Sequence, residues 1–214
     1  PLIHYAAAEV AAAGIDRAVL VTGPGDEAVI GYFSPNPGVE RALAERGNDE
    51  ELKRQRALDD MLHIEHVVQE EPLGFGHAVL MARDAVGDEP FALLLPDDLI
   101  WAERPAIRQL MDVRDAHGGS VLAAKRVPDA AVESLGIIAG NPVPEPTDRV
   151  AGAPVEERVW RVTGLVEKPP LSEAPSNLAI IGRYILTPAI FNHLKSTAKD
   201  QRGEIQLTNG LESL

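Results

Sequence analysis

The sequence contains no cysteine, and this absence excludes several kinds of chemistry. Without thiols the chain has no disulfide framework, no zinc–thiolate centre and no cysteine nucleophile, and its composition is compatible with a reducing compartment. We therefore expect a cytoplasmic protein. Long hydrophobic runs are missing as well, because no stretch approaches the about 20 apolar residues that a membrane-spanning helix requires. We accordingly expect no membrane partner.

Positive charge is also scarce. The chain carries 20 Lys and Arg residues against 33 Asp and Glu residues, which gives a formal net charge of −13. A surface that binds nucleic acid needs clustered cations that contact phosphates, so we expect no nucleic-acid partner. If the ligand is itself an anion, the site must supply a local lysine or a metal ion.

Motifs of covalent hydrolases are absent too. The sequence has no Gly-x-Ser-x-Gly elbow, and its 6 histidines show no His-x-x-x-His spacing. Together with the missing cysteine, these absences argue against a serine or cysteine hydrolase and against a histidine metal site.

The residues that are present predict an α/β fold. The chain has 214 residues, enough for one large domain or two small ones, and its 45% hydrophobic content is ordinary for a globular protein. Short unbroken apolar runs, such as 18–22 and 91–95, alternate with helical stretches. Such runs are typical of strands buried on both faces of a parallel sheet. Residues 34–62 differ, because they predict a charged helical excursion that covers a sheet edge or meets a partner.

Two carboxylates, Asp97 and Asp98, follow the run 91–95 after Pro96. In open α/β sheets the carboxyl ends of the strands form the ligand site, so both side chains are candidates for a metal or substrate contact. Taken alone, however, this stretch is better explained as a turn, because Pro and Asp both favour turns.

Other polar or glycine residues fall at predicted junctions between strands and loops. They are Gln69, Gly74, Gly136, Glu167, Lys168 and Asn177. Gly74 also precedes a predicted helix, where backbone N–H groups can approach a ligand closely. A metal-binding carboxylate, a lysine and several glycines suit phosphate chemistry. On its own, a Glu–Lys pair at a strand end is more often a solvated surface pair.

A set of motifs occurs together and in order, and jointly it is specific. The set comprises Gly74–Val79, Leu95–Asp98, Val166–Pro169, Ser176–Tyr184 and Gly203–Thr208. In these motifs the chain closely resembles the bacterial UTP–glucose-1-phosphate uridylyltransferases (UDP-glucose pyrophosphorylases) of the sugar-phosphate nucleotidyltransferase superfamily. The resemblance implies a Rossmann-like, three-layer αβα nucleotide-diphospho-sugar transferase fold with a mixed, mostly parallel central sheet. It covers nearly the whole chain, so we expect residues 1–214 to form a single domain.

The resemblance also implies a reaction. Enzymes of this family transfer UMP from UTP to glucose 1-phosphate, which yields UDP-glucose and pyrophosphate, and they depend on Mg²⁺. We therefore expect UTP and glucose 1-phosphate as substrates, and self-association into a homo-oligomer. Two alternatives remain open at this point. One is a nucleotidyltransferase for another nucleotide or sugar, such as a thymidylyltransferase, and the other is a non-catalytic module with the same fold.

Each residue that matches the family motifs takes an implied role. Asp97 and Lys168 would be catalytic, with Asp97 holding Mg²⁺ and Lys168 neutralising the sugar phosphate. Asp98 ranks below Asp97, because it is not an acid in every member. The implied substrate contacts are Gln69 and Gly74 to uracil, Gly136 and Glu167 to glucose, Lys168 to the phosphate, and Gly182, with Asn177 as a weaker candidate, beside the sugar pocket.

The sequence also departs from the family pattern. The family's glycine-rich triphosphate loop would precede residue 1, and a second metal-binding Asp would follow residue 214, so we expect an N- and C-terminally incomplete domain. Asp26 stands where many members carry Lys, and Asn209 stands where many carry Asp. If the protein consists of these 214 residues alone, we expect little or no turnover, whereas a longer parent chain should be active.

Overall fold

The computed structural model of the chain describes residues 1–59, 61–143 and 159–214. The elements in chain order are α1 (Leu2–Ala12), β1 (Arg17–Thr22), α2 (Glu27–Tyr32), α3 (Pro37–Glu45), α4 (Asp49–Asp59), β2 (His63–Val68), α5 (Phe75–Met81), α6 (Arg83–Val86), β3 (Phe91–Leu94), α7 (Ala106–His117), β4 (Val121–Arg126), α8 (Asp129–Val132), β5 (Gly136–Pro142), β6 (Trp160–Glu167), the 3-10 helix η2 (Leu171–Glu173), β7 (Leu178–Leu186), α9 (Ala189–Ser196) and α10 (Leu207–Glu212). None of the helices among these residues is both long and apolar enough to cross a membrane.

Local sequence explains where the main elements begin and end. The run Leu178–Leu186 is rich in Ile and Leu and forms β7, the longest strand described. Helix α7 begins after Pro105 and ends at Gly118, whose φ of 71° is readily available only to glycine. Helix α3 is capped by the side chain of Asn36, which accepts a hydrogen bond from the Val39 N–H at 3.1 Å.

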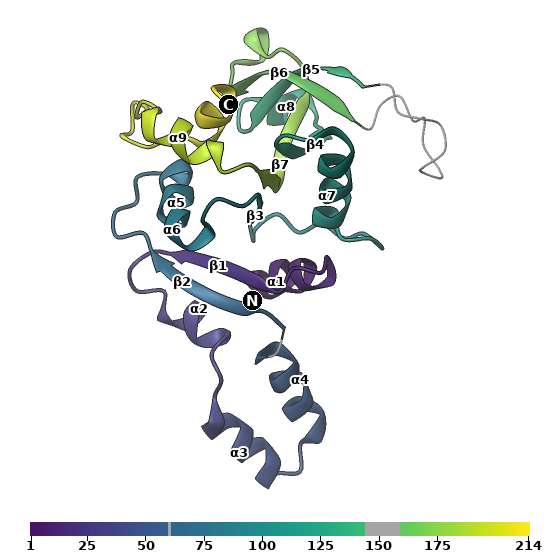
Figure 1. Cartoon of the computed structure of the whole chain (residues 1–214), viewed down its shortest axis with the longest axis vertical. Coiled ribbons are helices and arrows are strands. Elements are labelled where there is room, and N and C mark those ends of the chain that lie inside the picture. Colours follow the sequence, from purple (N-terminus) through teal and green to yellow (C-terminus); the bar gives the residue numbers. More distant parts are fainter. Residues whose placement is uncertain (60, 144–158) are drawn as a thin grey trace.

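The strands form two sheets (Figure 1). Strands β1 and β2 pair in parallel, with Arg17 opposite His63 and Thr22 opposite Val68. The second sheet has the order β3-β7-β5-β6, with β4 also pairing β7, and its pairs are antiparallel. The predicted α/β class and mixed strand pairing are confirmed. The parallel pairing is confined to β1 and β2 among the described strands, and the expected single sheet is divided between β1 and β3.

Helices cover both faces of the antiparallel sheet, as the predicted three-layer arrangement requires. Ile185 of β7 packs against Ile107 and Leu110 of α7. Its neighbours Tyr184 and Leu186 belong instead to the larger cluster formed with α9 and α10. Since successive side chains of a strand point to opposite faces, α7 and the pair α9–α10 lie on opposite sides of β7.

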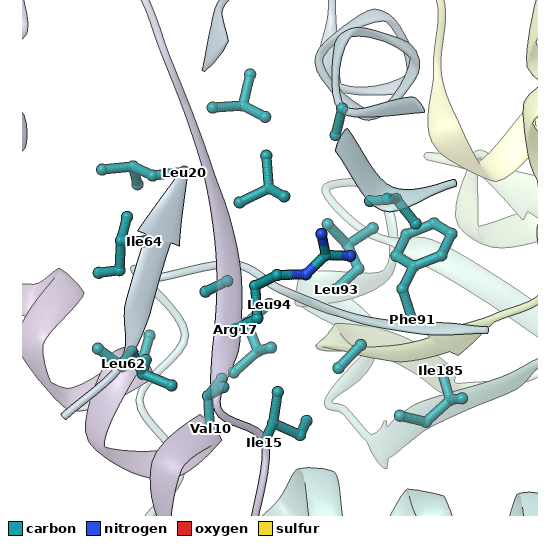
Figure 2. A pocket seen from close by; sticks show the side chains of 18 of the residues that line it. Val10, Ile15, Arg17, Leu20, Leu62, Ile64, Phe91, Leu93, Leu94 and Ile185 are labelled. Atoms are coloured by element: carbon teal, nitrogen blue, oxygen red, sulfur yellow. The ribbon is translucent and has the colours of Figure 1, made fainter. Parts of the chain in front are cut away.

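The core is concentrated on this sheet. Almost every residue of β7 is buried, whereas all residues of β1, β2 and β3 are half-buried or exposed. The prediction that the runs 18–22 and 91–95 are buried on both faces is therefore wrong for this structure. The physical reason is that β1 and β3 each pair along one edge only and both line the same cavity (Figure 2).

The predicted excursion at 34–62 is helical, as expected. Helices α3 and α4 lie together, joined by an ion pair between Glu40 and Arg56 at 3.0 Å, and α3 buries no residue. Figure 1 shows the two helices projecting away from both sheets, so they do not cover a sheet edge. The alternative, that the excursion meets a partner, stays a prediction.

Candidate functional site

A corner of polar groups forms where β5 begins and β6 ends. Gly136 lies directly opposite Glu167 in the antiparallel register. One Glu167 oxygen, Oε2, accepts a hydrogen bond from the Thr208 hydroxyl at 2.7 Å. A Cβ built on Gly136 would lie 3.1 Å from the Thr208 hydroxyl and 3.3 Å from that same carboxylate oxygen. The bare backbone at Gly136 therefore leaves the space in which the carboxylate and the hydroxyl meet.

Lys168, which directly follows Glu167 in the chain, has an unusual backbone conformation. Its φ is +46°, in the left-handed region that residues other than glycine rarely adopt. The Lys168 N–H donates to the Leu135 carbonyl at 3.1 Å, which ties the residue to the entry of β5. The ammonium is 3.4 Å from Glu167 Oε1, but about half of the side chain remains exposed. A cation is thus held at the rim of the corner, where it can reach an anionic ligand.

Asp97 and Asp98 differ in their surroundings although both are exposed. Asp98 Oδ2 accepts a hydrogen bond from the Gly182 N–H at 2.8 Å, so this side chain fixes the turn against β7. Gly182 allows that approach, because an added Cβ would lie 2.5 Å from the Leu95 Cβ. Asp97 makes no side-chain hydrogen bond or ion pair with the described residues. Its carboxylate therefore remains open to a ligand.

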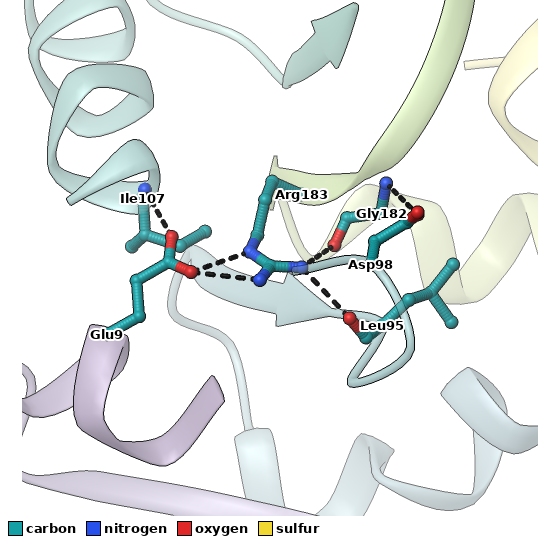
Figure 3. A network of polar contacts seen from close by, with 6 residues as sticks. All are labelled: Glu9, Leu95, Asp98, Ile107, Gly182 and Arg183. Atoms are coloured by element: carbon teal, nitrogen blue, oxygen red, sulfur yellow. Dashed lines mark hydrogen bonds and ion pairs between the residues drawn. The ribbon is translucent and has the colours of Figure 1, made fainter. Parts of the chain in front are cut away.

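A buried ion pair lies beside this turn (Figure 3). The Arg183 guanidinium contacts the Glu9 carboxylate at 2.9 and 3.0 Å, and it also donates to the Leu95 and Gly182 carbonyls at 2.9 and 2.8 Å. The second Glu9 oxygen accepts from the N–H of Ile107, at the start of α7, at 3.0 Å. Arg183 and Glu9 together thus join α1, α7, β7 and the turn that carries the two aspartates.

The predicted base-binding residues form a second group at the end of β2. The side-chain amide of Gln69 donates to the Gly74 carbonyl at 3.1 Å and lies 2.9 Å from His77 Nδ1. Gly74 has a φ of 96°, and a Cβ there would lie 2.8 Å from both Glu204 Cβ and the Ile205 carbonyl oxygen. Gly74 is therefore required both for its conformation and for close packing at this place.

One segment connects the two groups. Ile205 forms backbone hydrogen bonds at 2.8 Å with Leu73 and with Gly76, and Thr208, three residues further on, contacts Glu167. The segment is shaped by Asp200, whose carboxylate accepts from the N–H groups of Arg202 and Glu204. These hydrogen bonds, the Glu204 one foremost, lower the pKa of Asp200 from its usual range. Residues 200–208 thus link the predicted base-binding and sugar-binding groups.

The Asn177 side chain makes no hydrogen bond or ion pair with Gly136, Glu167 or Thr208 among the described residues. Its side-chain oxygen accepts from Arg126 at 3.2 Å, and it lies before β7, five positions from Gly182. At about 3.3 Å per residue, that separation along the strand is roughly 16 Å. Asn177 is therefore distant from Gly182, beside which it was predicted to lie.

Several residues of the site had no predicted role. They are Glu9, Tyr184, Arg183, Asp200 and Thr208. Tyr184, Arg183 and Thr208 fall inside recognised motifs, so motif membership was the available signal. Glu9 and Asp200 gave none, because their partners are distant in sequence or are backbone groups of the same turn.

The buried phenol of Tyr184 is influenced by two carboxylates of the site, Asp98 in the turn after β3 and Glu167 in the polar corner. Burial raises the pKa of its phenol above the ordinary value, and the negative charges of Asp98 and Glu167 add to the effect. Because the folded state favours the neutral phenol, its contribution to stability is complete below the unfolded pKa of about 10 and is lost as the pH rises beyond it.

A replacement of Tyr184 by Phe should therefore change the alkaline stability of the chain. Between about pH 8 and about pH 11, the native chain should lose more free energy of unfolding than Tyr184→Phe does, because only the native chain carries this phenol. Urea unfolding at several pH values measures the difference. Tyr5→Phe is the matched control, since Tyr5 is 56% exposed. Equal pH slopes for both variants would contradict the raised pKa.

The described residues do not form a complete metal site of their own. Within 1–59, 61–143 and 159–214 no group of three or more His, Cys, Asp or Glu side chains could hold a metal ion. Mg²⁺ is usually bound by one or two carboxylates together with waters and substrate phosphates, so a preformed cluster is not required. The open, hard carboxylate of Asp97 fits that mode of binding.

Comparison with known proteins agrees with this geometry. A family model described as nucleotidyl transferase matches residues 1–214. A UTP–glucose-1-phosphate uridylyltransferase of Bacillus subtilis (strain 168) is 40% identical over 214 residues, which cover 100% of this chain and 69% of the relative. An enzyme of the same name from Staphylococcus haemolyticus (strain JCSC1435) is 40% identical, with 100% of this chain and 70% of the relative covered.

Solved structures give the same result. A UDP-glucose pyrophosphorylase complexed with UDP-glucose matches with a TM-score of 0.82 and 34% identity, over 100% of this chain and 74% of that chain. A UTP-bound UGPase from Acinetobacter baumannii matches with a TM-score of 0.82 and 30% identity, over 100% of this chain and 70% of that chain. The resemblance and the fold predicted from the motifs are confirmed, and the chain belongs to the nucleotidyl transferase family.

Proposed function

We propose that this protein transfers UMP from UTP to glucose 1-phosphate, producing UDP-glucose and pyrophosphate. The observation that carries the proposal is the corner in which Gly136, Glu167 and Thr208 meet beside the Lys168 ammonium. Such a corner offers a carboxylate to sugar hydroxyls and a cation to the sugar phosphate. The uridylyltransferase of Bacillus subtilis to which the chain is similar is 40% identical to it over the whole chain.

The sugar would bind with its hydroxyl groups at Glu167. A carboxylate is a strong acceptor for hydroxyl donors, and Thr208 orients it through the 2.7 Å hydrogen bond. The absence of a side chain at Gly136 leaves room for the sugar ring. Lys168 would then neutralise the phosphate, since its ammonium carries three donors on a flexible stem at the rim.

Uracil would bind at the end of β2. The Gln69 side-chain nitrogen is engaged by the Gly74 carbonyl, which orients the amide group and leaves its oxygen to accept the uracil N3–H. The backbone at Gly74 would contact the other edge of the base. Residues 200–208 contact both places, through Ile205 beside Gly74 and through Thr208 at Glu167. The base-binding and sugar-binding contacts would therefore be linked through this segment.

Asp97 would hold Mg²⁺, together with oxygen atoms of the bound nucleotide. The bound ion would lower the charge repulsion between the two polyanionic substrates and help to align the α-phosphate. The turn after β3 contributes by keeping the Asp97 carboxylate in place, through Asp98 on Gly182 and Arg183 on Leu95.

The reaction needs positioning more than acid–base chemistry. An oxygen of the sugar phosphate attacks the α-phosphorus of UTP, the new P–O bond forms, and the bond to pyrophosphate breaks. Because the nucleophile is already an anion, neither a general base nor a covalent enzyme intermediate is required. The residues of this chain act by binding, alignment and charge neutralisation.

A panel of nucleotides and sugars tests the function. In calorimetry, we expect UDP-glucose to bind more tightly than dTDP-glucose or UDP-galactose. In an activity assay with UTP, glucose 1-phosphate and Mg²⁺, we expect UDP-glucose to be the product formed. Tighter binding of dTDP-glucose would favour a thymidylyltransferase instead. No binding of any nucleotide sugar would favour a non-catalytic module.

Gly136→Ala should weaken UDP-glucose binding by about tenfold or more, because the new methyl group displaces the Thr208 hydroxyl or the Glu167 carboxylate. Gly164→Ala is the matched control in the same sheet, since its nearest neighbour would be the Ala139 Cβ at 3.7 Å. Calorimetric titration with UDP-glucose measures both variants. Equal affinities would place the sugar elsewhere.

We further propose that the protein is cytoplasmic and self-associates, and that residues 1–214 form one domain. The absence of cysteine supports the first point, since it suits a reducing compartment. Sedimentation velocity tests the second, and cooperative urea unfolding with coincident probes tests the third.

A further inference from the structure

Two acceptors at the start of α5 meet the side chain of Gln69. Gln69 Nε2 donates to the Gly74 carbonyl at 3.1 Å, and the same nitrogen lies 2.9 Å from His77 Nδ1. Gly74 and His77 are three residues apart along the helix, so they lie on one of its faces. Both contacts are partly buried. The amide NH2 group of Gln69 therefore has one partner for each of its two hydrogens.

The backbone fixes both sides of this arrangement. The Gly74 carbonyl also accepts from the Ala78 N–H at 3.1 Å, which is the first hydrogen bond of the helix, so α5 sets its direction. The Gln69 N–H donates to the Thr22 carbonyl at 2.8 Å, and this bond holds the base of the Gln69 side chain against β1. The fold thus brings the amide group and its two acceptors together before any ligand binds.

The Gly74 carbonyl determines which way the Gln69 amide faces. If the amide were turned over, its oxygen would face the Gly74 oxygen, and two acceptors would meet without a hydrogen between them. The NH2 group must therefore lie beside Gly74. Gln69 Oε1 makes no hydrogen bond with the residues that the structure describes, so it is free to accept one from a ligand.

The orientation of the amide in turn determines the tautomer of His77. An amide nitrogen only donates, so His77 Nδ1 must be the acceptor, and the proton of the neutral ring lies on Nε2. In this tautomer His77 takes the second hydrogen of the Gln69 NH2 group. Turning the amide over would then break two hydrogen bonds instead of one. His77 therefore adds a second interaction that holds Gln69 in a single orientation.

The orientation of this amide distinguishes between pyrimidine bases. N3 of uracil carries a hydrogen and donates, whereas N3 of cytosine carries none and accepts. The oxygen of Gln69 pairs with the first base and repels the second, and the NH2 group in its place would do the reverse. Thymine has the same N3–H as uracil, so the orientation of the amide does not separate these two bases.

We propose that His77 determines base specificity through Gln69: by accepting the second amide hydrogen, it keeps the Gln69 oxygen toward the base and so favours uracil over cytosine. His77 is a positioning residue, because it acts on the amide and not on the substrate. The inference rests on the proposed function and deepens it by naming the group that sets the choice of base. A base that leaves a buried acceptor facing another acceptor is rejected.

Competition between nucleotide sugars tests the proposal. UDP-glucose, CDP-glucose and dTDP-glucose are titrated calorimetrically into the native protein and into His77→Leu, with weak binding read by displacement of UDP-glucose. The leucine keeps a side chain of similar reach on the helix but offers no acceptor. We expect the preference for UDP-glucose over CDP-glucose to fall by about fivefold or more. The preference for UDP-glucose over dTDP-glucose should stay within about twofold, since both bases present N3–H.

Two further variants separate positioning from packing. His77→Asn is the conservative variant, because its side-chain oxygen stands near the place of Nδ1 and can accept the amide hydrogen, so the native preference should return. His63→Leu removes an exposed histidine at the other end of β2 and should leave both preferences unchanged. A loss of packing alone would weaken all three nucleotide sugars together, and so would leave their ratios as they are.

Nitrogen-15 NMR spectra of the histidine rings examine the pair without nucleotide. At about pH 8, where imidazoles are ordinarily neutral, we expect His77 to carry its proton on Nε2. A proton on Nδ1 overturns the proposal, and so does a preference for UDP-glucose over CDP-glucose that changes by less than about twofold in His77→Leu. If the native protein binds UDP-glucose, either result removes this inference alone. If it binds no nucleotide sugar, the proposed function fails as well.

Discussion

Arg183→Met is expected to lower the free energy of unfolding by about 3 to 5 kcal/mol, the usual cost of breaking a buried ion pair from one side. Arg183 is 1% exposed, and Glu9 would be left with an uncompensated charge in a side chain that is 10% exposed. The Leu95 and Gly182 carbonyls would also lose their donor. Urea or thermal unfolding measures the loss.

Two further variants make the result specific. Arg161→Met removes an exposed arginine of β6 and should change stability by less than about 0.5 kcal/mol. The double variant Glu9→Met with Arg183→Met should recover part of the loss, because removing both charges leaves neither unpaired. If the double variant were as unstable as the sum of both single variants, the pair would not be coupled as the geometry indicates.

The sequence predicted the strands better than it predicted their burial. The apolar runs 18–22 and 91–95 lie in β1 and β3, because short apolar runs bounded by turn residues are typical of strands. Their half-buried state depends on which strand lies beside each, and that is decided by long-range pairing. No local pattern in β1 or β3 contains this information.

The candidate site was likewise predicted from the sequence only in part. Gly136 and Glu167 were both predicted at junctions between strands and loops, and the structure brings these residues together in one register. Thr208 and Arg183 lie within the motifs but had no predicted role, because their partners are 41 and 174 residues away in the chain. Asn177 matched a motif, yet its side chain is held by Arg126 instead. Membership in a motif is thus weaker evidence that a residue belongs to the site than strand pairing with another site residue.

The distinction between the two neighbouring aspartates leads to the second large effect. Asp98 is committed to the Gly182 N–H, whereas the Asp97 carboxylate has no partner among the described residues. A carboxylate that holds Mg²⁺ contributes several kcal/mol of charge stabilisation in reactions of this kind. Replacing Asp97 by Asn should therefore lower UDP-glucose formation by about 100-fold or more.

Asp98→Asn is the matched control, because an amide oxygen can still accept from Gly182 and so preserve the turn. It should keep the fold and most of the turnover. Turnover is measured with UTP, glucose 1-phosphate and Mg²⁺. Calorimetric binding of UTP with Mg²⁺ or with EDTA gives a readout that needs no turnover, and Asp97→Asn should abolish the difference between these two conditions. A larger loss of turnover in Asp98→Asn than in Asp97→Asn would indicate that Asp98, and not Asp97, holds the metal. An unchanged Mg²⁺ dependence in both variants would remove this turn from the metal site altogether.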